Sequence, residues 1–369
     1  SGGLTIFSSQ LLTNSDFFTS AFPSEYCNAL SGVFDMKFRN GNSFKREHTI
    51  QVGIQGVDIA SEGPLFKNSS ASYLINYRYS IFGFLQLIDK DMRNKIPSYQ
   101  DLSFKVNIPA GNAGTFTLFG IGGIDKSKFD PDADSTKWEN LDDRTKTTLN
   151  NTMGAFGLSY AVPLGRNTLM KTIFSGSGQT VDYEKGFMNT SYYVEPVDNV
   201  SHKTSELSGS AYINHKFSHF HVNKTGIIYK QMYFNSNISS QNQFTGNYET
   251  FVNDKGSTGI LQAYTQSTVN LHERLTFSGG INYSHFVLNS SSTFEPRLSA
   301  KYLLTGRSAL SFGYGNHSQY EDISVYLSQN QTADNSITKP NINLKPSRAN
   351  HFVMGYDLMF SSDLHLKIE

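Results

Sequence analysis

The chain has 369 residues with 31 basic and 31 acidic side chains, so its formal net charge is zero. Without a net positive field, the composition gives no support to nucleic acid as a partner. The single cysteine, Cys27, excludes an intrachain disulfide framework and a cysteine-based zinc cluster. Charged residues make up 17% of the chain, below the roughly 25% of ordinary soluble proteins, while aromatic residues reach 13%.

Residues 1–43 differ from the rest of the chain. They form a mixed segment that ends in a predicted short strand over residues 33–39, followed by the turn signal Asn40-Gly41-Asn42. The chain opens on Ser1 without a Met and stops inside an alternating run. We therefore expect a fragment with sequence missing at both ends, and the absence of a signal peptide carries no weight.

From about Thr49 onward, apolar and polar residues alternate with a period of two. In one run the apolar face consists of Leu275, Phe277, Gly279, Ile281 and Tyr283. Because successive strand side chains point to opposite faces, each such run needs one apolar and one wet environment. We predict about fifteen strands, with cores at residues 49–54, 57–61, 73–78, 102–108, 116–121, 156–162, 169–174, 207–215, 226–233, 261–269, 275–286, 297–303, 310–317, 351–360 and 364–368.

The predicted connections alternate in length along the chain. Short turns are expected at residues 63–71, 109–114, 163–167, 218–223, 270–274, 305–307 and 361–363. Long polar connections are expected at residues 80–100, 125–151, 182–204, 235–257 and 319–346, with one short exception at 287–293. This parity is typical of an outer-membrane barrel, with lipid outside and water inside. The predicted fold is thus all-β, a transmembrane antiparallel β-barrel. No run approaches the ~20 apolar residues of a membrane-spanning helix.

Several short stretches carry a family resemblance. Residues 22–35, with Glu25, Tyr26, Asn28, Gly32 and Val33 as the plug motif, resemble the end of the plug domain of TonB-dependent outer-membrane receptors. Further resemblances are Gly63-Pro64-Leu65, Phe294-Glu295-Pro296-Arg297-Leu298, residues 310–315 and Asn343-Leu344-Lys345-Pro346. The resemblance is closest to receptors with a carboxypeptidase-regulatory-like domain, which is not in this chain.

The resemblance implies an architecture and a function. A complete barrel would have about 22 strands, so residues 44–369 would be a partial barrel of about fifteen strands and residues 1–43 the C-terminal part of the plug. Such a receptor sits in the outer membrane of a Gram-negative bacterium, in contact with its lipid. It imports a scarce solute (a siderophore, a glycan or a peptide) with energy from TonB, which acts through the missing N-terminal part. A surface lipoprotein is a further partner that the resemblance allows.

Two other classes stay open. A passive porin would share the barrel but needs no plug, and a surface adhesin or other β-rich binding protein would share the alternation but not the loop parity. No Gly-x-Ser-x-Gly elbow is present, so we expect neither an enzyme nor catalytic residues, and no cofactor. In this family a Gly usually stands where this chain has Cys27, and a left-handed backbone there would make Cys costly.

The predicted outer loops hold the candidate binding residues. Asp130, Asp132 and Asp134 alternate as in a calcium loop, with Asp142 and Asp143 nearby. They lack the Gly and the distal Glu of the EF-hand pattern, which favours a solvated acidic loop tip. The aromatic residues expected in the loops are Trp138, Tyr192, Tyr193 and Tyr248. They could stack on a ligand or anchor the loops, and both readings stay open.

Two further groups complete the prediction. His215, His219 and His221 surround one short turn, and their spacing favours a polar rim over a zinc site. Alternation places Arg297, Lys301 and Arg78 on the lumenal face. We expect these cations to pair with carboxylates of the plug, such as Glu25 and Asp35.

Overall fold

The structure is a computed structural model that describes residues 6–53, 56–80, 98–242, 244–332, 334 and 336–369. No helix in these ranges is long and apolar enough to cross a membrane. The few helical turns are short: η1 (Gly111–Ala113), η2 (Ser135–Lys137), η3 (Asp142–Arg144) and α2 (Ile323–Tyr326).

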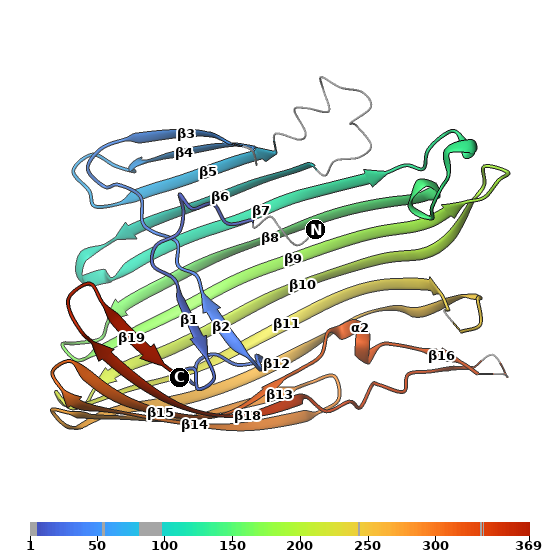
Figure 1. Cartoon of the computed structure of the whole chain (residues 1–369). Helices are drawn as coiled ribbons and strands as arrows, with labels where there is room; N and C mark the ends of the chain where they lie inside the picture. The colour runs from blue at the N-terminus through green and yellow to red at the C-terminus, as the bar shows by residue number, and fades with distance from the viewer. Residues whose placement is uncertain (1–5, 54–55, 81–97, 243, 333, 335) are drawn as a thin grey trace.

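One large antiparallel sheet of 15 strands dominates the molecule (Figure 1), and each strand pairs with its neighbours in chain order. The sheet order ends at β3 on one side and at β19 on the other. Its strands are β3 (Glu47–Gly53), β4 (Gly56–Pro64), β5 (Ser72–Ser80), β6 (Ser98–Pro109), β7 (Thr115–Phe129), β8 (Thr145–Pro163), β9 (Thr168–Met188), β10 (Val194–Lys216), β11 (His221–Gln241), β12 (Tyr248–His272), β13 (Leu275–Phe286), β14 (Ser291–Thr305), β15 (Ser308–Gln319), β18 (Ser347–Met359) and β19 (His365–Ile368).

Each of the fifteen predicted strand cores coincides with a strand of this sheet, although residue 54 lies outside the described residues. The predicted faces are confirmed as well. On β13, Phe277 and Ile281 are each 39% exposed on the outer face, whereas Asn282 is fully buried on the other face. A period of two with one polar, covered face and one apolar, exposed face is the pattern of a barrel wall.

The lengths of the outer connections were predicted wrongly in two cases. Residues 182–204 are not a loop, because β9 and β10 pair up to Met188 and Val194 and leave only a turn at 189–193. Residues 235–257 likewise shrink to a turn at 242–247 between β11 and β12. The apolar residues of these strand ends do not keep a period of two, since Val194, Val197 and Val200 are three positions apart. The period-two signal therefore fades there, although the backbone ladder continues. The predicted connection 80–100 lies mostly outside the described residues.

The predicted alternation of long and short connections is confirmed only in part. The connections after β7 and after β15 are long, whereas those after β9, β11 and β13 are no longer than the turn between β4 and β5. In Figure 1 the short turns gather at one end of the sheet, and the turns that follow β7, β9 and β11 lie at the other end. The short exception near residue 287 is confirmed too, since only residues 287–290 separate β13 from β14.

Residues 6–39, which we call the N-terminal segment, stand apart from the large sheet. They contain a two-stranded sheet of β1 (Asp16–Thr19) and β2 (Gly32–Asp35), seen across the large sheet in Figure 1. The predicted strand 33–39 is shorter than expected and ends at Asp35, although Phe38 forms one more bridge to Leu12. The segment has side-chain contacts with strands from β4 to β15, so it lies on the concave, lumenal side of the sheet.

The long connection after β15 also packs inward. Its first turn, α2, belongs to an apolar cluster on the lumenal face of β11–β13, whose members are Phe234, Val252, Ile260, Phe286, Tyr320, Ile323, Tyr326 and Leu327. Two short strands, β16 (Asn330–Gln331) and β17 (Ile337–Thr338), pair farther along the same connection.

Candidate functional site: the lumenal interface of the N-terminal segment

Arg297 is the centre of the interface between the N-terminal segment and the sheet. Its Nη1 donates to the carbonyl oxygens of Pro23 at 2.6 Å and of Tyr26 at 2.5 Å. Its Nη2 donates to Oε2 of Glu295 at 2.6 Å, and the two side chains are only 4% and 1% exposed. Both residues sit on the lumenal face of β14, two positions apart, as the alternation of a strand requires. The buried carboxylate of Glu295 thus neutralises the buried guanidinium of Arg297. The guanidinium in turn binds two backbone carbonyl groups of the N-terminal segment.

Side chains of β12 and β13 bind the N-terminal segment at Ser24. The backbone N–H of Ser24 donates to Oε1 of Gln266 at 2.7 Å, and Nδ2 of Asn282 donates to the Ser24 carbonyl at 2.8 Å. Ser24 is fully buried. Two lumenal amides thereby satisfy both backbone groups of a residue that has no strand partner.

β15 adds an aromatic contact. The ring of His317 stacks on Phe22 at 4.0 Å between centroids and bonds to the Ser20 carbonyl. Phe22 is 1% exposed, and the guanidinium of Arg297 lies 4.6 Å from its ring centroid. Phe22 therefore contacts both an aromatic ring and a cation.

The predicted partners of the lumenal cations were wrong. Glu25 pairs with Lys224 of β11, and neither Arg297 nor Arg78 binds it. Asp35 stays within the N-terminal segment, where it accepts from the Tyr26 hydroxyl at 2.9 Å and lies 3.2 Å from Lys37.

Arg78 pairs at 2.8 Å with Asp101, its direct cross-strand neighbour on β6, and Lys301 is exposed. Strand register decides which charges meet, and alternation alone does not give the register.

Asn28, another residue of the predicted plug motif, has a left-handed backbone with φ of +57°. Its side-chain Oδ1 accepts from the backbone N–H of Tyr320 at 2.8 Å. The backbone of Cys27, which lies within the described residues, is not left-handed. The conformational cost that we expected for Cys at this site therefore does not arise. Asn tolerates this conformation better than most residues. Burial raises the pKa of the Cys27 thiol to about 11.

The far side of the lumen contacts the segment through charges. Arg39 makes two parallel hydrogen bonds to Glu62 on β4, at 2.7 and 2.6 Å. Nζ of Lys105 on β6 donates to the Phe38 carbonyl at 2.6 Å. The N-terminal segment is thus bound to both sides of the curved sheet by polar groups.

The sequence matches the family model described as "TonB dependent receptor-like, beta-barrel" over residues 35–368. The chain belongs to this family. Its members are barrels of the outer membrane of Gram-negative bacteria, and the protein therefore belongs to that membrane. No curated protein sequence gives a match.

Solved structures of receptors share the fold at low sequence identity. The siderophore receptor PirA from Acinetobacter baumannii superimposes with a TM-score of 0.68 and 14% identity, over 97% of this chain and 56% of that chain. The ferric yersiniabactin uptake receptor FyuA from Yersinia pestis gives 0.67 and 12%, over 96% and 58%. The copper transporter OprC gives 0.61 and 11%, over 94% and 56%. The chain thus spans just over half the length of these receptors.

The acidic loop of this TonB-dependent receptor chain directs its carboxylates to separate partners. Asp130 pairs with Lys128 at 2.8 Å, and Asp134 accepts from the N–H of Thr136 at 3.1 Å. Asp143 accepts from the N–H of Glu139 at 2.9 Å, and the Asp132 carboxylate accepts from the N–H of Asp134 at 3.0 Å. Within the described ranges no three His, Cys, Asp or Glu residues gather as a metal site. The loop has the geometry of a self-capped acidic tip.

Two of the four loop aromatics contact each other. The rings of Trp138 and Tyr192 lie 6.1 Å apart, and the Tyr192 hydroxyl donates to Oγ of Ser135 at 3.1 Å. They join the 130–144 loop to the β9–β10 turn. Tyr193 is 66% exposed beside them, and Tyr248 is 44% exposed on the separate β11–β12 hairpin. The structure does not bring the four rings together.

The three histidines lie at the opposite end of the barrel wall. His215 bonds to Oγ1 of Thr168 at 2.7 Å, and His221 bonds to Oγ of Ser267 at 3.0 Å. The ring of His219 packs against Phe220. They form a polar and aromatic rim.

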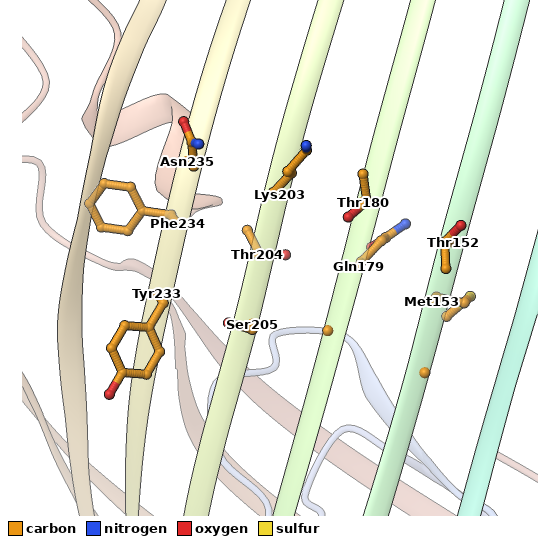
Figure 2. Close-up of a pocket in the computed structure, with 12 residues that line it drawn as sticks. Thr152, Met153, Gln179, Thr180, Lys203, Thr204, Ser205, Tyr233, Phe234 and Asn235 are labelled. Atoms are coloured by element: carbon orange, nitrogen blue, oxygen red, sulfur yellow. The ribbon is translucent and has the colours of Figure 1, made fainter.

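A hollow of about 580 Å³ crosses strands β8 to β11 (Figure 2). One of its rows consists of the cross-strand neighbours Thr152, Thr180, Lys203 and Asn235. The parity of β8 places Thr152 on the same face as Phe156 and Leu158, which are 47% and 48% exposed. The hollow is therefore on the outer, lipid-side face, near the edge of the apolar band, and not in the lumen.

Proposed function

We propose that this chain is part of a receptor that imports a scarce solute across the outer membrane with energy delivered by TonB. In this proposal residues 1–43 are the end of the plug and residues 44–369 are part of the barrel. The observation that carries it is the seating of the N-terminal segment in the lumen through Arg297, Asn282, Gln266 and Lys224.

The chemistry of this interface suits a movable plug. Its contacts are mainly hydrogen bonds and ion pairs, each of which water can replace when the lumen opens. A net hydrogen bond is worth only about 0.5–1.5 kcal/mol, because the unbonded groups regain water. An apolar plug core would instead expose its surface to water on every cycle, at about 25 cal/mol per Å². A polar interface therefore blocks a wide lumen at rest and still releases under a pull.

A ferric siderophore is the solute class that we favour. Two of the three structural neighbours above are named as siderophore or ferric yersiniabactin receptors, and the third as a copper transporter. The contacts of the candidate site support transport but do not select the solute, so glycans and peptides are the other arms of the test.

The test compares uptake in three strains: the parent, one lacking the full-length receptor gene, and one lacking TonB. A panel of radiolabelled ferric siderophores, oligosaccharides and peptides is supplied to each at low concentration. We expect one class to be taken up only when both receptor and TonB are present. Uptake that depends on the receptor but not on TonB would identify a passive porin instead.

A disulfide clamp then tests the plug itself. In a Cys27→Ala background, Ser24→Cys and Asn282→Cys place two thiols where the Ser24 backbone meets the Asn282 side chain. Oxidation should stop uptake and reduction should restore it, with each single cysteine as its control. Full uptake by the oxidised, cross-linked receptor would contradict a moving plug.

A further inference from the structure

The start of the connection after β15 is held inside the lumen. We call residues 320–327 the α2 segment. Its Tyr320, Ile323, Tyr326 and Leu327 are 6%, 3%, 0% and 2% exposed. The ring of Phe286, on the wall strand β13, lies 4.8 Å from that of Tyr320 and 5.3 Å from that of Tyr326. An outer connection is thus packed onto the lumenal wall through buried apolar side chains.

The first residue of the α2 segment is also bonded to the N-terminal segment. The Tyr320 N–H donates to the side chain of Asn28, and the Tyr320 hydroxyl lies 3.2 Å from Oγ of Ser284 on β13. The left-handed backbone of Asn28 fixes the direction of its amide. One side chain of the N-terminal segment thus supplies the acceptor for the backbone amide of Tyr320, a buried residue of an outer connection.

Neighbouring contacts tie the same two regions together. Three residues before Tyr320, His317 stacks on Phe22 and bonds to the carbonyl of Ser20. Arg297 holds the carbonyl of Tyr26, two residues before Asn28. Residues 20–28 therefore cannot leave their place without breaking the contacts of the His317 side chain and removing the acceptor of the Tyr320 amide.

We propose that Asn28 is a positioning residue that couples the plug to the outer side of the receptor, because its side chain holds the α2 segment in the lumen. This rests on the proposed function, in which the N-terminal segment moves during import. When residues 20–28 are displaced, the Tyr320 amide loses its acceptor and the α2 segment loosens. Coupling between two sites is reciprocal, so loosening the α2 segment also loosens residues 20–28.

Hydrogen exchange measured by mass spectrometry on the full-length receptor, without solute or TonB, tests the first direction. Asn28→Gly keeps the left-handed backbone but removes the acceptor, and Asn28→Asp keeps both. We expect Asn28→Gly to speed exchange in residues 320–327 about fivefold, as the loss of one hydrogen bond implies. Asn28→Asp should exchange like the parent. A change of less than twofold in Asn28→Gly, or an equal rise across β13 and β15, would overturn the proposal.

Labelling of the natural Cys27 tests the reverse direction. Ile323→Ala removes an apolar contact of the α2 segment and should speed the reaction of Cys27 with a maleimide severalfold. Ile337→Ala, at a side chain that is 61% exposed on β17, is the matched control and should leave the rate unchanged. Equal rates in Ile323→Ala and the parent would overturn the reciprocal coupling. Neither measurement uses solute or TonB, so a failure of the import proposal would be seen separately, in the uptake assay.

Discussion

At the scale of single residues, the interface depends on backbone groups of the N-terminal segment and on side chains of the wall. Arg297, Asn282 and Gln266 bind carbonyls and an N–H of residues 23–26, and not the side chains there. The wall thus recognises the backbone position of Pro23, Ser24 and Tyr26, whereas Glu25 and Asn28 make their contacts through their side chains. The charge pairs expected from the sequence were wrong at Glu25 and Asp35, while the lumenal face of Arg297 was right.

The buried pair of Arg297 and Glu295 gives the first prediction. Arg297→Met leaves Glu295 buried without its cation, which should cost about 3–5 kcal/mol. The double variant Glu295→Gln/Arg297→Met removes the stranded charge and should recover part of that loss. Urea unfolding of the full-length receptor in detergent, followed by heat-modifiable gel mobility, measures both. If Arg297→Met were as stable as the double variant, the Glu295 carboxylate would not be destabilised by the loss of its cation.

The thiol of Cys27 gives the second prediction. Its pKa is raised to about 11, first of all by burial, so at pH 8 the reactive thiolate is scarce. Because the thiolate forms only near the raised pKa, labelling of the folded receptor should stay slow until the pH approaches 11. We expect a maleimide to react at least about tenfold more slowly with native than with urea-unfolded protein at pH 8. Equal rates would mean that Cys27 is open to solvent.

At the scale of elements, each strand has an apolar outer face and a lumenal face that is either polar or packed against the interior. The lumenal face is not uniform, since Asn282 is fully buried against the N-terminal segment while Ser278 on the same strand is only partly covered. Ser278 is therefore the better lumenal control for substitutions on β13.

The third prediction compares the two faces of β13. Ile281→Arg places a charge on the lipid side, which should cost about 2–4 kcal/mol near the middle of the membrane. Ser278→Arg places the same side chain in the lumen, next to Thr268. Heat-modifiable mobility of the full-length receptor in outer-membrane fractions should fall sharply for Ile281→Arg and little for Ser278→Arg. Similar losses in both would contradict the register of this strand.

The outer ends of β9 and β10 give the fourth prediction. Lys185 and Lys203 lie in paired strands, whereas Lys137 lies in the 130–144 loop. Proteases need a locally unfolded backbone, which a paired hairpin rarely offers. Trypsin added to intact cells should cleave after Lys137 well before Lys185 or Lys203, as mass spectrometry of the fragments would show. Cleavage at Lys185 as fast as at Lys137 would contradict the strand pairing and indicate that residues 182–204 form a loop.

At the scale of the whole molecule, the parity of the connections sets the orientation. Turns such as 110–114 and 164–167 lie at one end of the sheet, and the 130–144 loop and the 189–193 turn at the other. In outer-membrane barrels the short turns are periplasmic and the longer connections extracellular.

The fifth prediction follows from that parity. Epitope tags at Asp132, Ser191 and Asn247 should bind antibody on intact cells. Tags at Gly111, Gly165 and Gly306 should bind only after the outer membrane is opened. Tagged receptors that still show heat-modifiable mobility are compared, so that misassembly does not count. Antibody binding at Gly165 on intact cells would reverse the orientation.

The sequence by itself determined the strands and their two faces, and it determined the long connections after β7 and β15. Period-two patterning indicates the environment of each strand directly, because the apolar face must contact lipid and the polar face must contact water or the lumen. The same pattern put Arg297 and Arg78 in the lumen. It failed at the outer ends of β9 to β12, because the apolar residues there, such as Val194, Val197 and Val200, do not alternate with polar ones.

Only the tertiary structure decided which groups meet. Glu25 pairs with Lys224, which is 199 residues away in the chain. Asn28 accepts from the amide of Tyr320, which is 292 residues away. Such contacts depend on strand register and on the path of the N-terminal segment through the lumen. Alternation fixes the face of a residue but not its height along the wall, so the partners of Arg297, the left-handed Asn28 and the inward packing of α2 could not be predicted from the sequence.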